Sequence, residues 1–524
     1  MSTLPPPPPA VHVPPTPLAE LVEGLRARGL LAGDVIGPAD VRVQDVTIDS
    51  REAERGVLFA AVSPDTHTGR DGHDFVDDAL ARGASAALVS GEWLRQRPEP
   101  SSAPAPLGKG ERLPGAALVP TTDTRAALAE VAGHVYGRPG DALTLLGVTG
   151  TNGKTTTVFL LHHLLTALGV TAGMVGTVEN RIGTARYATA FTTPEAPALQ
   201  RVLRAMVEAE CTHAAMEVSS HGLALDRVAG LPFRVAVFTN LTQDHLDYHA
   251  SFEAYADAKK RLFDGLATDA VAVVNGDDPA HERMTADTAA EVVTFGTSSG
   301  VDVRVEVLAN TIDGLRLRLD GEERTFRLAG RFNALNLAAA YASGVALGFG
   351  RGAVLDALAA APGVPGRFEA IGGAGVLGVV DYAHTPDALD NVLATARELV
   401  PAGSALWVVT GSGGDRDRGK RPQMAAVAER RADRVVVTQD NPRTEDPHRI
   451  VDDMREGFER PDATVTLLDR AEAIAFAVTE AADGDVIVIA GKGHETYQNI
   501  GGVKRPFDDR LVLREALLTR ATAR

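Results

Sequence analysis

The stretch at residues 144–157 constrains this chain more than any other. It reads Thr-Leu-Leu-Gly-Val-Thr-Gly-Thr-Asn-Gly-Lys-Thr-Thr-Thr, and an apolar helical pattern follows at 158–168. An apolar run, a glycine-containing turn and a helix in this order are typical of a strand, a phosphate-binding loop and a helix. The backbone N–H groups of such a loop point at an anion, the helix start adds partial positive charge, and Lys154 adds a full charge.

The loop has the shorter form Gly150-x-x-Gly153-Lys154-Thr155, because Val148 stands where the longer pattern requires a glycine. We expect the Thr155 hydroxyl to bind Mg²⁺. The alternative is a glycine-rich turn beside a solvated lysine, but the strand and helix on either side favour a nucleotide site. The predicted phosphate-binding residues are Gly150, Thr151, Asn152, Gly153, Lys154, Thr155 and Thr156.

Composition argues against several classes of function. The 524 residues carry a formal net charge of −17 without a basic stripe, so nucleic acid is a poor partner. The single cysteine, Cys211, excludes an intramolecular disulfide framework and a cysteine-built zinc site, and it fits a reducing cytosol. No apolar run approaches membrane-spanning length, and residues 1–17 do not resemble a signal peptide. We expect a cytoplasmic monomer that does not insert into a membrane.

The length suggests about three domains, and strands alternate with helices through most of the chain, which indicates an α/β protein. We predict a disordered proline-rich tail at 1–17, an N-terminal domain at 18–142, a central domain at 143–365 and a C-terminal domain at 366–524. The central domain should contain a parallel sheet like that of P-loop ATPases, and the C-terminal domain should be Rossmann-like. The C-terminal domain lacks the G-x-G-x-x-G pattern, so NAD binding is not supported. The Pro/Ser/Gly-rich stretch at 97–114 should be a surface loop.

Two predicted strands of the central domain end in polar residues. Glu217 is the next-to-last residue of the strand predicted at 213–218. Asp244 and His245 follow the strand predicted at 234–239. Ligands of parallel sheets gather beyond the carboxyl ends of the strands. Glu217 is therefore a candidate Mg²⁺ ligand, and His245 could bind metal or contact phosphate. The alternatives are an exposed glutamate at a strand end and an ordinary loop histidine.

A helix predicted at 251–263, with Ser251 as its N-cap, carries a lysine on its apolar side. Lys259 falls on the apolar stripe, whereas Lys260 is turned about 100° away. A lysine that faces inward loses hydration and its pKa falls, so its neutral amine could take up CO₂ as a carbamate and then hold Mg²⁺. The alternative is a lysine that lies along apolar surface with its ammonium in water. The stripe comprises Phe252, Tyr255 and Leu262.

Three polar patches follow successive strands of the C-terminal domain, at 411–422, 440–447 and 491–495. All three could face one cleft at the carboxyl edge of the sheet. Arg416 and Arg443 could each hold a carboxylate, and Glu495 suits an ammonium group. The patches therefore predict a pocket for an amino acid with an additional carboxylate, the alternative being charges on solvated loops.

The phosphate loop, the polar strand ends and parts of two of the three patches belong to nine short strings of this sequence. Together the nine strings resemble the Mur ligases, the ATP-dependent amide-bond synthetases of bacterial cell-wall assembly, and among them the MurE-type tripeptide synthetases. The strings occur in the family's order from residue 47 to residue 495. Three stretches depart from the family pattern: the proline tail, residues 97–114, and residues 188–190 before Phe191. The matching strings are TIDSR at 47–51, GTNGKTT at 150–156, FTTP at 191–194, MEVSSHG at 216–222, TNLTQDHLDYH at 239–249, FNALN at 332–336, DYAHTP at 381–386, DNPR at 440–443 and GKGHE at 491–495.

The resemblance implies an ATP-dependent acid–amino-acid ligase that produces ADP. Its N-terminal domain would hold a UDP-sugar, its central domain ATP and Mg²⁺, and its mobile C-terminal domain the incoming amino acid. The UDP-substrate, UDP-N-acetylmuramoyl-L-alanyl-D-glutamate, would contact Ser50, Thr192, Thr193, Ser220 and Arg227. The implied catalytic residues are Lys154, Glu217, His245 and Lys259, and the implied metal ligands are Thr155, Glu217, His245 and Lys259 as its carbamate. Asn336 and Asp381 would contact adenosine. The amino-acid pocket would comprise Arg416, Asp440, Asn441, Pro442, Arg443, Gly491 and Glu495.

The resemblance also implies the reaction. The γ-phosphate of ATP would activate the D-glutamate γ-carboxylate as an acyl phosphate, which the amine of diaminopimelate would then attack. Arg443 matches the residue that reads the distal carboxylate of diaminopimelate, which lysine lacks. Two alternatives stay open at this stage: a related ligase with another acceptor, such as lysine or the glutamate added to folate, and a non-catalytic nucleotide-binding switch.

Overall fold

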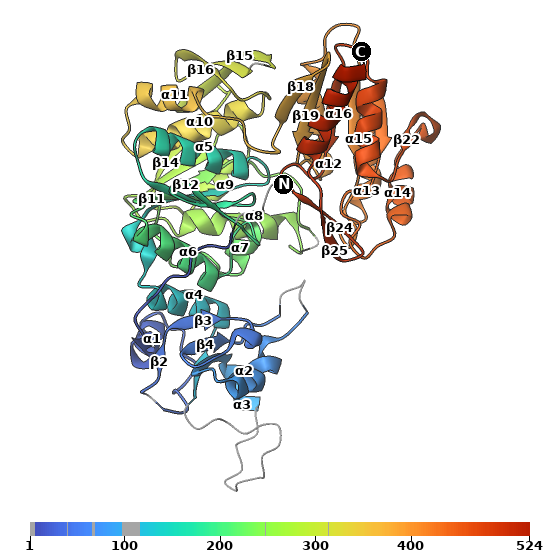
Figure 1. Ribbon diagram of the computed structural model, residues 1–524. Helices are drawn as coiled ribbons and strands as arrows, with labels where there is room; N and C mark the ends of the chain where they lie inside the picture. The colour runs from blue at the N-terminus through green and yellow to red at the C-terminus, as the bar shows by residue number, and fades with distance from the viewer. Residues whose placement is uncertain are drawn as a thin grey trace.

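The computed structural model describes residues 6–38, 40–64, 69–96, 116–246, 248–312 and 314–523. Figure 1 shows three groups of helices and strands that follow one another along the chain, in blue, in green to yellow, and in orange to red. Each group contains its own sheet, and the α/β class predicted from the sequence is confirmed. The predicted domain limits stay predictions, and the loop predicted at 97–114 lies outside the described residues.

The N-terminal sheet is parallel, with strand order β3-β4-β5-β6, and its helices bury apolar residues against it. A small antiparallel pair, β1 with β2, lies beside this sheet. The strands are β1 (Thr16–Pro17), β2 (Arg42–Val43), β3 (Asp45–Thr47), β4 (Val57–Ala60), β5 (Ala86–Ser90) and β6 (Ala117–Thr121), and the helices are α1 (Leu18–Ala27), α2 (Val76–Arg82), α3 (Gly91–Gln96) and α4 (Thr124–Val135).

The described part of the proline-rich tail lies against the N-terminal domain, and the predicted disorder of residues 1–17 stays a prediction. Val13 is only 6% exposed within the N-terminal core, and Thr16 and Pro17 pair with Val43 and Arg42. A proline has no N–H group and cannot donate to a sheet. Isolated valines between the prolines nevertheless provide enough apolar surface to hold residues 6–17 against the protein.

The central sheet is parallel from β8 to β15 in the order β8-β11-β7-β12-β13-β14-β15. Antiparallel strands β9 and β10 extend one edge, and β16 and β17 extend the other. The bounds are β7 (Thr144–Thr149), β8 (Ala172–Val175), β9 (Asn180–Ile182), β10 (Ala185–Tyr187), β11 (His213–Glu217), β12 (Phe233–Phe238), β13 (Val271–Asn275), β14 (Glu291–Gly296), β15 (Val303–Thr311), β16 (Gly314–Leu319) and β17 (Glu322–Phe326).

Side chains alternate across this sheet and form two cores, as strand geometry requires. Leu146 and Val148 of β7 pack with α5, α10 and α11, whereas Leu145 packs with α6 and α8 on the opposite face. The loop that follows β7 therefore lies at the carboxyl ends of the strands, between two helical layers. The helices are α5 (Lys154–Ala167), α6 (Ala196–Glu208), α7 (Ser220–Ala224), α8 (Phe252–Asp264), α9 (His281–Thr285), α10 (Asn333–Ala346) and α11 (Arg351–Ala359).

The C-terminal sheet has the order β18-β19-β23-β20-β21-β22, and only β18 runs antiparallel to its neighbour. Helices cover both faces, as in a Rossmann-like fold. The strands of this sheet are β18 (Glu369–Gly373), β19 (Val376–Asp381), β20 (Leu406–Thr410), β21 (Arg434–Val437), β22 (Val465–Thr466) and β23 (Val486–Ala490). A separate antiparallel pair comprises β24 (Tyr497–Ile500) and β25 (Val503–Pro506). The helices are α12 (Pro386–Arg397), α13 (Lys420–Arg431), α14 (Pro447–Arg455), α15 (Arg470–Glu480) and α16 (Asp509–Ala523).

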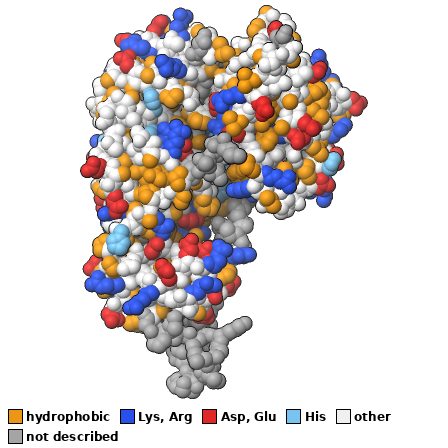
Figure 2. Space-filling view, in the orientation of Figure 1, with side chains coloured by type: hydrophobic (Ala, Val, Ile, Leu, Met, Phe, Trp, Pro, Cys, Tyr) orange, Lys and Arg blue, Asp and Glu red, His pale blue; other side chains and the backbone are white. Residues whose placement is uncertain are grey.

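The surface carries both signs of charge. On the face that Figure 2 shows, acidic and basic side chains are interspersed. Within the described ranges, no helix combines the length and the apolar character that crossing a membrane would require.

Candidate functional site

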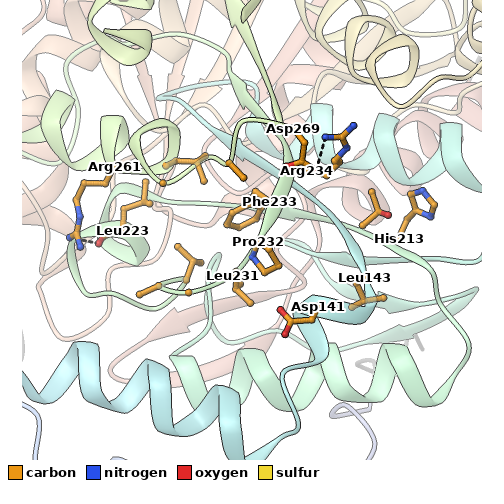
Figure 3. A pocket seen from close by; sticks show the side chains of 18 of the residues that line it. Asp141, Leu143, His213, Leu223, Leu231, Pro232, Phe233, Arg234, Arg261 and Asp269 are labelled. Atoms are coloured by element: carbon orange, nitrogen blue, oxygen red, sulfur yellow. Dashed lines mark hydrogen bonds and ion pairs between the residues drawn. The ribbon is translucent and has the colours of Figure 1, made fainter. Parts of the chain in front are cut away.

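A cavity of about 1370 Å³ lies beyond the carboxyl ends of the central strands, where all three domains contribute residues to its lining. The N-terminal domain contributes Ser50, the central domain Lys154 and Glu217, and the C-terminal domain Arg416. A second hollow of about 780 Å³ opens at the opposite end of the central strands, beside Thr144, His213 and Phe233. Figure 3 shows Leu231, Pro232 and Phe233 in the middle of this second hollow, which contains none of the predicted site residues. The larger cavity is therefore the candidate site.

The phosphate loop connects β7 to α5 and has the cradle shape that an anion needs. Gly150 and Gly153 have φ values of 146° and 87°. A Cβ atom on Gly150 would lie 1.9 Å from Thr239 Oγ1, and one on Gly153 would lie 2.5 Å from Asn336 Oδ1, so neither position tolerates a larger residue. No side chain caps the start of α5, which leaves its first N–H groups directed towards the cavity. These features fit the phosphates of a nucleotide.

Two lysines donate to the same backbone oxygen of this loop. Lys154 Nζ and Lys259 Nζ each lie 2.8 Å from the Gly150 carbonyl, and Lys154 also donates to the Thr151 carbonyl. Burial lowers the pKa of both amines, that of Lys259 well below its usual value, and each is lowered further by a nearby positive charge, from Arg367 at Lys154 and from Lys154 at Lys259. Burial thus disfavours the charged forms of these amines, and an anion bound beside them would favour those forms.

Helix α8 places Lys259 in the site much as its sequence predicts. Ser251 Oγ accepts from the Ala254 N–H at 3.1 Å and caps the helix. Lys259 is 1% exposed beside the buried Tyr255 ring, 4.4 Å from the ring centre, whereas Lys260 pairs with Asp264 and Asp287 at the surface. Phe252 is 40% exposed, so its predicted place in the buried stripe was wrong, because the first turn of α8 extends past the core.

Glu217 is held rigidly at the end of β11. Its Oε2 accepts from Thr155 Oγ1 at 2.9 Å and from Thr177 Oγ1 at 3.1 Å, and its Oε1 accepts from the Thr177 N–H at 2.7 Å. A carboxylate beside a hydroxyl of the phosphate loop is the oxygen-rich donor set that Mg²⁺ takes, with substrate phosphates as further ligands. Across the parts of the chain that the structure describes, no group of three His, Cys, Asp or Glu side chains could hold a metal by itself.

His245 lies at the same end of the sheet, in a left-handed backbone conformation with φ of 54°. Its ring packs edge-on against His221, with 4.9 Å between the ring centres, and its Nε2 lies 3.4 Å from Asp244 Oδ2. Burial alone would raise the pKa of Asp244, but positive charge from His245, His384 and Lys154 outweighs it and lowers that pKa. Both residues line the cavity beside Lys154.

All five residues predicted for the UDP-substrate line the same cavity. Thr193 is buried, accepting from the Ser219 N–H and donating to the Glu217 carbonyl, so its hydroxyl links the β11 end to the loop at 188–195. Arg227 donates to the Thr193 carbonyl at 2.9 Å and pairs with Glu195 at 2.6 Å. The five residues are Ser50, Thr192, Thr193, Ser220 and Arg227.

The two residues predicted for adenosine also line the cavity. Asn336 lies against Gly153 and donates to Asn333 Oδ1 at 2.9 Å, so the two asparagines share one face of α10. Asp381 accepts from the N–H groups of Phe368 and Ala383, both at 2.7 Å, and burial raises its pKa. Asp381 therefore fixes the chain segment that joins the central and C-terminal domains.

Two residues of the C-terminal side escaped the sequence analysis. Arg367 Nη2 donates to Thr155 Oγ1 at 3.1 Å, and Asp387 Oδ2 accepts from Asn152 Nδ2 and Thr242 Oγ1, both at 3.1 Å. Among the described residues, Arg367 Nε has no hydrogen-bond partner although it is buried. No local pattern marks either residue, since both reach the loop from another domain.

The predicted amino-acid residues form a cluster of their own in the C-terminal domain. Asn441 Nδ2 and Lys492 Nζ both donate to Glu495 Oε2 at 2.7 Å, and Arg443 Nη1 donates to the Gly414 carbonyl at 2.6 Å. Of the seven predicted residues only Arg416 lines the cavity, while Asp440, Asn441, Pro442, Arg443, Gly491 and Glu495 do not.

Glycines bring the members of this cluster together. A Cβ atom on Gly413 would lie 3.0 Å from Arg443 Nη1 and 3.8 Å from Arg416 Cγ, so both arginines flank Gly413. A Cβ atom on Gly491 would lie 2.3 Å from Asp440 Oδ2, so Gly491 allows that carboxylate to approach. The cluster thus continues from the cavity wall at Arg416 into the C-terminal domain.

The sequence and the structure are similar to those of known proteins. The sequence pattern described as the Mur ligase middle domain matches residues 148–344, and the one described as the Mur ligase, glutamate ligase domain matches residues 366–493. A UDP-N-acetylmuramoyl-L-alanyl-D-glutamate–2,6-diaminopimelate ligase of Cytophaga hutchinsonii is 43% identical over 488 residues, which cover 93% of this chain and 96% of that protein.

Two solved structures resemble the whole chain. One, of a UDP-N-acetylmuramoyl-L-alanyl-D-glutamate–2,6-diaminopimelate ligase, has a TM-score of 0.63 at 34% identity and covers 93% of this chain and 98% of its own. The other, a MurF ligase from Thermotoga maritima in complex with ADP, has a TM-score of 0.58 at 21% identity and covers 91% and 97% of the two chains. The second likeness concerns the fold alone.

Proposed function

This chain belongs to the Mur ligase family, and from that premise we propose that it is an ATP-dependent ligase that joins diaminopimelate to UDP-N-acetylmuramoyl-L-alanyl-D-glutamate. The observation that carries the proposal is the single cavity in which the phosphate loop, the UDP-substrate residues and Arg416 meet. A relative that bears the name of this activity matches nearly the full length of the chain. The product would be the tripeptide precursor of peptidoglycan.

ATP would bind at the phosphate loop. The glycine cradle and the match to the Mur ligase middle domain over residues 148–344 support this assignment. Lys154 would exchange its bonds to the Gly150 and Thr151 carbonyls for phosphate oxygens, which would relieve its shared contact with Lys259. Arg367 would add a second positive charge from the segment that joins the domains, because its guanidinium already contacts Thr155.

Thr155 and Glu217 are the residues that would hold Mg²⁺, with His245 nearby. When bound, the ion would neutralise charge on the transferring phosphate. The neutral amine of Lys259 would attack CO₂, forming an N–C bond while the electron pair of one C=O π bond moves to oxygen. The nitrogen would then lose a proton to water, so that a carbamate anion replaces the amine. This exchange turns the repulsion between Lys259 and Lys154 into an attraction, and it gives the site another pair of oxygen ligands.

The chemistry then requires little more than alignment and the exclusion of water. The D-glutamate γ-carboxylate would take the γ-phosphate and release ADP. The amine of diaminopimelate would attack the acyl phosphate, and inorganic phosphate would leave. Glu495 and Asn441 would hold the ammonium end of the amino acid, while Arg416 and Arg443 would hold its carboxylates. Closure of the C-terminal domain would bring this cluster to the cavity.

We also propose a cytoplasmic monomer. Residues from three domains of one chain line the cavity, which supports a site built within a single chain. The nucleotide substrates and the lone, buried Cys211 fit a reducing compartment.

A phosphate-release assay with single omissions tests the proposed function. Phosphate should appear only when ATP, the UDP-dipeptide and diaminopimelate are all present, and meso- and LL-diaminopimelate should be supplied separately. Lysine should replace diaminopimelate poorly, because it cannot engage the second arginine. Equal rates with lysine would reassign the acceptor, and phosphate release from ATP alone would contradict the ligase assignment.

A further inference from the structure

Two stretches that depart from the family pattern, the proline tail and residues 188–190, contact each other. The Ala188 N–H donates to the Pro6 carbonyl at 2.8 Å. In Figure 1 the dark blue chain leaves the N-terminal domain and runs along the central domain. We call residues 6–17 the strap.

The strap is anchored at both ends and in the middle. Thr16 and Pro17 pair with β2, and Arg42 Nη1 donates to the Pro15 carbonyl at 3.0 Å. Val13 is buried in the N-terminal core, whereas Val11 packs against both the N-terminal and the central core. The strap therefore crosses the boundary between two domains that both line the cavity.

Proline chemistry suits this arrangement. A proline has a fixed φ and no N–H group, so a proline run loses little entropy on docking and offers only carbonyl acceptors. Pro6 acts as an acceptor here, and its donor Ala188 directly follows edge strand β10. The strap thus satisfies a donor at the edge of the central sheet.

The segment that the strap contacts leads directly to predicted substrate residues. Thr192 and Thr193 are fixed from the central domain through Thr177 and Glu217. Ala188, at the other end of this short segment, is fixed by Pro6. Between them Phe191 is 53% exposed at the cavity, with the Arg227 guanidinium 5.3 Å from its ring centre.

We propose that the strap positions the segment at 188–193, and the angle between the N-terminal and central domains, for binding of the UDP-substrate. Pro6 and Val11 are positioning residues in this scheme, because they act through Ala188 and through the two cores. The proposal rests on the proposed function, since it assigns the UDP-substrate to this half of the cavity.

Deletion of residues 2–12 in the otherwise full chain tests the proposal, because it removes Pro6 and Val11 but keeps Val13 and β1. The KM for the UDP-dipeptide should rise about five- to tenfold, while kcat and the KM for ATP change less than about twofold. Val11→Ser should give the same pattern more weakly. His12→Ser, an exposed neighbour on the strap, is the matched control and should leave all constants unchanged.

Hydrogen exchange at the Ala188 amide provides a readout that does not depend on activity. It should accelerate about tenfold or more in the deletion variant. An unchanged KM for the UDP-dipeptide, or an equal loss in every kinetic constant, would overturn the proposal. If the full chain ligates nothing, the proposed function fails; the strap proposal then stands or falls by whether the deletion changes exchange at Ala188.

Discussion

Lys154 and Lys259 share one acceptor, the Gly150 carbonyl, inside a buried site. Burial lowers the pKa of both amines, and the positive charge of Lys154 lowers the pKa of Lys259 further. Holding both amines charged in this buried site costs free energy unless a negative charge lies beside them. A bound nucleotide or a carbamate would supply that charge. The two lysines therefore favour both nucleotide binding and carbamate formation at this site.

Replacing Lys259 with arginine tests the carbamate. Arginine keeps the positive charge but cannot form a carbamate, so kcat should fall at least about a hundredfold, or about 3 kcal/mol. The wild-type enzyme should also lose activity in buffers freed of CO₂ and recover it with bicarbonate. Lys260→Arg, on the same helix but paired with Asp264 and Asp287, should retain activity. An active Lys259→Arg variant would exclude the carbamate.

Substitution of Arg443 tests which amino acid the pocket selects. Its guanidinium lies beside Gly413 and Gly414, close to Arg416. Arg443→Ala should lower kcat/KM for diaminopimelate about ten- to a hundredfold, the cost of losing a charge-assisted pair. The constant for lysine, which has no distal carboxylate, should change little. A uniform loss for both acceptors would show that Arg443 holds the pocket together without reading the substrate.

At the scale of elements, α12 connects the C-terminal domain to the phosphate loop. Asp387 in its first turn accepts from Asn152 and Thr242 of the central domain. Asp387→Ala should therefore loosen the C-terminal domain and raise the radius of gyration measured by X-ray scattering, together with the KM for ATP.

Asp390 on the same helix provides the matched control. It pairs with Arg430 and Arg431 inside the C-terminal domain. Asp390→Ala should leave the radius of gyration unchanged. If both variants behave alike, the contact between α12 and the loop has no special role.

Most core elements could be predicted from the sequence, because buried parallel strands appear as short apolar runs. The strands predicted at 213–218 and 234–239 correspond to β11 and β12 within one residue at each end. Strands β15 to β17 were not predicted. The alternation of Val303, Arg304 and Val305 is nevertheless typical of a strand with one solvent-exposed face.

The site was predictable where its residues follow strands, and not where domains meet. Glu217 and Lys259 could be identified from a strand end and a helical stripe. Arg367 could not, because its contact with Thr155 depends on the turn at Gly366, whose φ is 64°, and on how two domains dock. The strap contact between Pro6 and Ala188 spans 182 residues and has no local signature.

At the scale of the whole molecule, buried histidines set the response to acid. Burial lowers the pKa of His162 to about 4, that of His384 to about 4 and that of His494 to about 3. The unfolded chain binds protons at these histidines near pH 6.5, whereas the folded chain does not. Stability should therefore be full above pH 6.5 and fall as the pH drops towards 4.

His162 is the clearest case, since it is 4% exposed. Its share of the loss should be about 2 kcal/mol at pH 5, from the difference between the two pKa values. Denaturant unfolding at pH 7.5 and pH 5 should show a smaller difference for His162→Gln than for the wild type. His448→Gln, at an exposed position on α14, should keep the wild-type difference. An unchanged pH difference in His162→Gln would contradict the assignment.

The central claim is that one cavity brings a triphosphate to a dipeptide carboxylate and then presents an amine. Labelling the D-glutamate γ-carboxylate of the UDP-dipeptide with ¹⁸O tests it most directly. Passage through an acyl phosphate predicts that each released phosphate carries one ¹⁸O atom and that the product is the amide of diaminopimelate. Phosphate without the label would mean that water, and not the carboxylate, attacks ATP, and it would contradict the account.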